Sequence, residues 1–66
     1  MNITVNGSQH VHQGNGSLAE LLKELNARPD LVAIVVNGRM VLKSERVSVR
    51  LRDGDQVEIL TFIGGG

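Results

Sequence analysis

The chain lacks cysteine, tryptophan and tyrosine, and it has one phenylalanine, Phe62, and one proline, Pro29. Without cysteine there is no disulfide, no cysteine-ligated zinc site, and no cysteine nucleophile or side-chain persulfide. The chain has no surplus of either charge, because 7 Lys and Arg residues balance 7 Asp and Glu residues. A non-specific nucleic-acid binder needs excess cations to displace counterions, so we expect no nucleic-acid partner.

Long apolar runs are also absent. No run approaches the roughly 20 residues that span a bilayer, and residues 1–7 lack the basic and then apolar layout of a signal peptide. We therefore expect a cytoplasmic protein with no membrane partner. The chain has 66 residues, of which 41% are hydrophobic, which is enough for one small core and too little to enclose a substrate pocket. No acid–base or nucleophile pair is visible, so we expect no enzyme.

The N-terminal half predicts a hairpin and then a helix. Ile3 and Val5 alternate with polar residues as in a half-buried strand. The dipeptide Asn6-Gly7 suits a two-residue turn, and a polar return strand follows through Val11. Ser17 and Glu20 have the spacing of a helical capping box. An apolar stripe at helical spacing follows, and Pro29 disfavours a helix beyond about Ala27. The stripe consists of Leu18, Leu21, Leu22 and Leu25.

The C-terminal half predicts strands only. The segment 31–36 is apolar on both alternating faces, as in an interior strand, and Asn37-Gly38 turns it into a return strand at 40–42. Alternation predicts further strands at 47–51 and 56–63. One helix with these strands predicts an α+β fold, in which one main helix covers a mixed sheet of four to five strands. The known topology for this order is the ubiquitin-like β-grasp, with the first and last strands as parallel neighbours. We expect one domain, 1–63, followed by a flexible tail, 64–66.

The tail is the most informative segment for function. Gly64, Gly65 and Gly66 have no side chains to pack, and when extended they reach on the order of 10 Å beyond the last strand. Such an arm can thread a narrow channel of a partner and present the Gly66 carboxylate. A carboxylate is a poor electrophile until it is activated, for example by adenylation, so a partner must perform the chemistry. The alternative is a terminal segment without function.

The last predicted strand has a second apolar face. If Val57 and Ile59 lie under the helix, Leu60 and Phe62 face away from it. Exposed apolar groups of this kind commonly mark a protein contact, so we predict that a partner docks there. Coverage by loops and dimerisation are the alternatives.

His10 and His12 are two residues apart, so on a strand they would share a face. No nearby Asp, Glu or Cys in the sequence completes a ligand set, so we predict a solvated polar edge strand and no metal site. The segment 10–15 has no functional assignment.

The ordered motifs resemble the ThiS family, the sulfur carriers of thiamine biosynthesis. The resemblance covers essentially the whole chain and is carried by segments 1–7, 16–22, 32–38 and 53–59, together with the Gly65-Gly66 end. It implies that a ThiF-like adenylyltransferase activates Gly66 with ATP and magnesium, while the chain itself binds no cofactor. A cysteine desulfurase then supplies sulfur, and the Gly66 thiocarboxylate donates it to a ThiG-like thiazole synthase. Gly64 and Gly65 would thread the partner, and Leu60, Phe62 and Ile63 would dock on it.

Two alternative functions remain. The small subunit of molybdopterin synthase shares the fold, the diglycine end and the thiocarboxylate, although those chains usually run longer. A non-catalytic ubiquitin-like binding module would carry the glycines incidentally.

Overall fold

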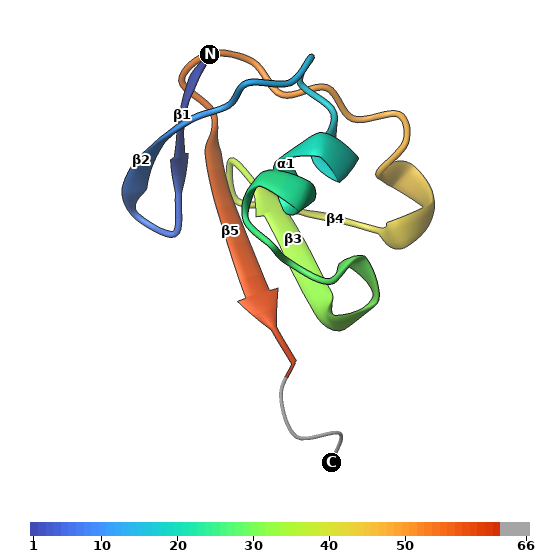
Figure 1. Ribbon diagram of the computed structural model, residues 1–66. Helices are drawn as coiled ribbons and strands as arrows, with labels where there is room; N and C mark the ends of the chain where they lie inside the picture. Colours follow the sequence, from blue (N-terminus) through green and yellow to red (C-terminus); the bar gives the residue numbers. More distant parts are fainter. Residues whose placement is uncertain (63–66) are drawn as a thin grey trace.

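Within residues 1–62, which are the residues that the computed structural model describes, five strands form one mixed sheet, and one α-helix lies across a face of it (Figure 1). Ile63 and the expected glycine tail, 64–66, lie outside these residues. The elements in chain order are β1 (Asn2–Val5), β2 (Ser8–Val11), α1 (Leu18–Glu24), the 3₁₀ turn η1 (Pro29–Leu31), β3 (Val32–Val36), β4 (Arg39–Val41), the 3₁₀ turn η2 (Lys43–Glu45) and β5 (Gln56–Thr61).

The sheet has the strand order β2-β1-β5-β3-β4. Strands β1 and β5, the first and last in the chain, pair in parallel at its centre, with Val5 opposite Val57. The other three pairings are antiparallel. This arrangement confirms the predicted β-grasp topology. Strand β5 pairs with β1 at Gln56 and Val57 and with β3 from Val57 to Thr61 (Figure 1).

Both Asn-Gly pairs form the predicted hairpin turns. Asn6 and Gly7 have φ angles of 49° and 82°, and Asn37 and Gly38 have 52° and 82°, which are the positive values that a two-residue turn requires. The Asn6 side chain also bonds to the backbone of Ile59, accepting its N–H at 2.8 Å and donating to its carbonyl at 3.2 Å. This asparagine therefore turns the chain and extends the bonding of β1 to β5.

Helix α1 begins as predicted. The Ser17 hydroxyl accepts the backbone N–H of Glu20 at 3.0 Å. The reciprocal half of the capping box does not form, because the Ser17 N–H donates to the side-chain oxygen of Asn15 at 3.2 Å. No helix within residues 1–62 is both long and apolar enough to cross a membrane.

The helix ends earlier than predicted, at Glu24. Asn26 takes a left-handed φ of 55°, and the Ala27 N–H reaches back to the Leu22 carbonyl at 2.9 Å. These features form the capping motif that often ends a helix. Asn26, and not Pro29, therefore ends α1.

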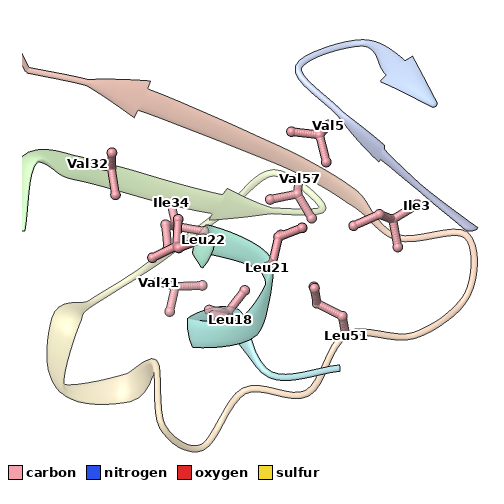
Figure 2. Packing of buried hydrophobic residues seen from close by; sticks show 10 residues of the cluster. All are labelled: Ile3, Val5, Leu18, Leu21, Leu22, Val32, Ile34, Val41, Leu51 and Val57. Atoms are coloured by element: carbon pink, nitrogen blue, oxygen red, sulfur yellow. The ribbon is translucent and has the colours of Figure 1, made fainter. Parts of the chain in front are cut away.

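The core lies between α1 and the sheet. Leu21 and Ile34 are fully buried, and the predicted helical stripe supplies much of the cluster. Leu51 enters it from the loop before β5 (Figure 2). The buried hydrophobic residues are Ile3, Val5, Leu18, Leu21, Leu22, Val32, Ile34, Val41, Leu51 and Val57.

The predicted strand at 47–51 is wrong. This segment contains a turn and a single bridge between Arg50 and Ser17. The Leu51 N–H donates to the Gly16 carbonyl at 2.7 Å, so the segment is held beside the start of α1 and lies outside the sheet. Val47 and Leu51 belong to the same alternating set, yet Leu51 enters the core while Val47 stays 81% exposed, so the alternation here does not mark one buried face.

Candidate functional site

Strand β5 presents an apolar surface on the face of the sheet opposite α1. Val57 packs into the core with 1% of its surface exposed, whereas Leu60 and Phe62 are 53% and 65% exposed. The prediction that these two side chains are uncovered within this chain is therefore confirmed. Alternation along the strand explains the difference, because successive side chains point to opposite faces.

Neighbouring strands enlarge this surface. Ala33 of β3 lies opposite Leu60, and Val35 lies opposite Met40 of β4. Directly paired residues point to the same face of a sheet, and Met40 is 59% exposed. We call Ala33, Val35, Met40, Leu60 and Phe62 the open-face patch.

Sequence reasoning missed Ala33, Val35 and Met40 as members of the patch. The apolar residues on both faces of 31–36 indicated an interior strand, and only the register with β5 and β4 shows which of them adjoin Leu60. An exposed apolar surface of this kind can bind another protein. Glu58 lies opposite Val35 on the same face of the sheet, so a carboxylate borders the patch.

The patch continues to the end of the described chain. The Phe62 N–H donates to the Leu31 carbonyl at 2.8 Å, so the backbone is still bonded to its neighbour one residue after β5 ends. The docking prediction for Ile63 and the roles predicted for Gly64, Gly65 and Gly66 concern residues outside 1–62. The structure thus places the patch directly before the segment to which the sequence assigns the chemistry.

A second cluster joins residues that sequence reasoning had left apart. His10 Nε2 and His12 Nδ1 lie 2.8 and 2.9 Å from the same carboxylate oxygen of Glu24. The other Glu24 oxygen accepts the backbone N–H groups of Gln13 at 2.8 Å and Gly14 at 3.2 Å. The prediction of a solvated strand is wrong for His12, which is 2% exposed. We call His10, His12 and Glu24 the histidine–carboxylate cluster.

A signal for this burial was present in the sequence. A two-residue turn at Asn6-Gly7 pairs Ile3 with His10, and paired residues share a face. His10 and His12 therefore belong to the side of the sheet that holds the core. The carboxylate comes from the last residue of α1, whose distance from β2 only the tertiary structure sets.

Hydrogen bonding determines the protonation pattern of the cluster. The Gly16 N–H donates to His12 Nε2 at 3.0 Å, so this nitrogen carries a lone pair and the ring proton sits on Nδ1, where it is donated to Glu24. The hydrogen bonds from His10, and then from His12, lower the pKa of Glu24 from 4.5 to about 2, against the opposing effect of desolvation.

The cluster connects secondary-structure elements. It ties β2 and the segment 12–14 to the end of α1 through side-chain and backbone donors. Among the described residues, no group of three or more His, Cys, Asp or Glu side chains has an arrangement that could hold a metal ion. We therefore assign the cluster to stability, and the open-face patch is the candidate functional site.

Comparison with known proteins finds similarity over essentially the whole chain. A family model described as the ThiS family matches residues 2–66. A crystal structure of the thiamine biosynthesis protein ThiS from Geobacter metallireducens is 36% identical, covers 100% of both chains and superposes with a TM-score of 0.81. A solution structure of a thiamine biosynthesis protein from the same organism gives a TM-score of 0.78 at 36% identity, covering 100% of this chain and 88% of that one.

Two curated proteins are similar over the whole of this chain. The thiazole synthases of Paramagnetospirillum magneticum and Magnetococcus marinus are each 36% identical to it over 66 residues. The match covers 100% of this chain and 20% of each of those proteins. The chain thus spans about a fifth of the length of these curated relatives.

Proposed function

Because this chain belongs to the ThiS family, we propose that it carries sulfur for the thiazole ring of thiamine as a thiocarboxylate on Gly66. The family match over residues 2–66 carries this proposal. It extends through the glycine run, and the similarity to a ThiS crystal structure covers the full length of both chains. The same match favours thiamine biosynthesis over molybdopterin synthesis and over a simple binding module.

The chemistry follows from what the chain contains and lacks. A carboxylate resists nucleophilic attack, so the partner first joins Gly66 to AMP, using ATP and magnesium and releasing pyrophosphate. A persulfide sulfur then displaces AMP, and reduction of the sulfur–sulfur bond by a thiol leaves the thiocarboxylate. The chain has no cysteine, so the transferred sulfur is held at the terminal carbonyl and not on a side chain. In this proposal the chain is a protein co-substrate, and the enzymes that act on it hold the catalytic groups.

The partners in this proposal are three enzymes. A ThiF-like adenylyltransferase activates Gly66, a cysteine desulfurase supplies the persulfide, and a ThiG-like thiazole synthase consumes the sulfur. For the last of these, support comes from proteins named thiazole synthase that include a region 36% identical to this chain. We place these reactions in the cytoplasm, where ATP and reducing thiols are available.

Sulfur loading gives a direct test by intact mass. We incubate the chain with a ThiF-like enzyme, ATP, magnesium, a cysteine desulfurase and cysteine, and we expect a mass gain equal to the difference between one sulfur and one oxygen. Omission of ATP is the control and leaves the mass unchanged. Transfer of this sulfur to a thiazole synthase supports the proposed pathway, whereas a chain that stays unmodified under full conditions contradicts it.

Phe62→Asp tests the docking role of the open-face patch. A buried charge at an aromatic contact commonly weakens binding about tenfold or more, so we expect this loss in affinity for the adenylyltransferase, measured by calorimetry. Phe62 is 65% exposed, so the thermal midpoint should change little. Val11→Asp, at a 57% exposed valine on edge strand β2, is the control and retains affinity. If the variant instead melts at a lower temperature and binds with unchanged affinity, Phe62 stabilises the fold and does not contact the partner.

A further inference from the structure

An apolar groove lies on the helix side of the molecule, away from the open-face patch. It has a volume of about 510 Å³ and runs between α1 and the loop that follows η2. Its apolar lining includes Ala19 and Leu22 from the helix, Pro29 from η1, and Val47 from the loop. Val47 is 81% exposed, so the groove presents a large apolar side chain that the core does not use.

Three cations surround this groove. Lys23, Arg46 and Arg50 line it, and none of the described residues that line it carries a carboxylate. Within residues 1–62, no Lys or Arg nitrogen lies within 4.0 Å of a carboxylate oxygen. The charged residues that line the groove are therefore all cations, although the whole sequence has no net charge. We call these cations and the apolar lining the basic groove.

Arg46 fixes the shape of the basic groove. Its two terminal nitrogens donate to the Pro29 carbonyl at 2.8 Å and the Val32 carbonyl at 2.7 Å, which ties the loop to the start of β3. Its Nε is buried and has no hydrogen-bond partner among the residues of the described chain. Lys23 and Arg50 are exposed, so they are available to an incoming carboxylate.

We propose that the basic groove binds an acidic segment of a partner protein, which inserts an apolar side chain beside Val47 and pairs its carboxylates with Lys23 and Arg50. Charge complementarity identifies the occupant, because an apolar surface rimmed only by cations favours an apolar anchor flanked by anions. The opposite face of the sheet carries Leu60 and Phe62, so this segment can bind while the open-face patch is occupied. The proposal does not depend on the sulfur-carrier function.

Short synthetic peptides test this proposal on the whole chain by NMR titration. The probe is an acetylated and amidated peptide of sequence Glu-Asp-Leu-Phe-Asp-Glu. We expect saturable shifts of backbone signals at Lys23, Val47 and Arg50, and weaker binding as salt screens the charges. One control peptide has serine at both apolar positions and another has lysine at the four acidic positions, and neither should produce saturable shifts at these residues.

Matched charge reversals locate the site. The double variant Lys23→Glu, Arg50→Glu should bind the acidic peptide at least about tenfold more weakly, and Val47→Ser should also weaken binding. The double variant Arg39→Glu, Arg52→Glu changes charge equally outside the groove and should retain affinity. Thermal melts establish that each variant is folded. Absence of saturable shifts, shifts centred on Leu60 and Phe62, or equal affinity in both double variants would overturn the proposal.

Discussion

Removal of Gly66 should abolish sulfur loading and leave the fold intact. Deletion moves the terminal carboxylate back by one residue, or about 3.3–3.6 Å of extended chain. A displacement of about 1 Å at a reacting group can lower a rate about a hundredfold, so the intact mass should stay unchanged within the time that loads the full chain. Val57 is the last residue of the buried hydrophobic cluster found within residues 1–62, so we expect an unchanged thermal midpoint.

A matched extension sharpens this test. Addition of one glycine after Gly66 moves the carboxylate outward by the same length and should also prevent loading, although no residue of the chain is lost. If the shortened chain still gains sulfur at the rate of the full chain, Gly66 is not the acceptor. If both altered chains melt early, the tail contributes to the fold, and the mass result alone would not support the assignment.

Glu24→Gln should cause a large loss of stability. The carboxylate accepts hydrogen bonds from His10, His12, and the N–H groups of Gln13 and Gly14. An amide places its own NH₂ group among these donors, so some of them lose their acceptor. Hydrogen bonds to charged groups contribute roughly 1.5–3 kcal/mol each and are not additive, so we expect a total loss of about 2–4 kcal/mol in urea unfolding at pH 7.

Glu20→Gln is the matched control for this substitution. Glu20 is an exposed residue in the first turn of the same helix, and its replacement should change the free energy of unfolding by less than about 0.5 kcal/mol. Equal effects of the two substitutions would show that the histidine–carboxylate cluster contributes nothing specific.

The cluster also predicts how stability depends on pH. The pKa of Glu24 is lowered from 4.5 to about 2 in the folded chain, so the unfolded chain takes up this proton first as the solution is acidified. The stability that the ionised carboxylate contributes is fully present above about pH 4.5 and is lost as pH falls towards 2. The difference in stability between wild type and Glu24→Gln should therefore narrow over this interval. Parallel pH profiles would contradict this account.

The basic groove and the open-face patch are the two separate surfaces that we propose for partners. The patch includes Leu60 and Phe62 at the end of β5, so a partner that docks there contacts residues close in sequence to Gly66. The groove lies on the helix side, between α1 and the loop after η2. If the proposed function holds, two separate surfaces would allow one partner to bind before another is released.

The sequence by itself determined those features that depend only on residues close together in the chain. Both Asn-Gly turns, the Ser17 cap and the helical leucine stripe depend on a few adjacent residues, so they were predictable. The exposed positions of Leu60 and Phe62 followed from alternation along one strand. The glycine run led to the hypothesis that a partner performs the chemistry on the terminal carboxylate, and this stays a prediction.

Only the tertiary structure decided which distant residues meet. The extent of the patch depends on the register of β3 against β5 and β4, and the burial of His12 depends on Glu24 at the end of α1. The segment 47–51 has the alternation of a strand, yet the hydrogen bond from Leu51 to the Gly16 carbonyl and the bridge between Arg50 and Ser17 hold it outside the sheet. Alternation indicates which side chains can share a face. Which of them are buried, and what covers them, depends on contacts between residues far apart in the chain.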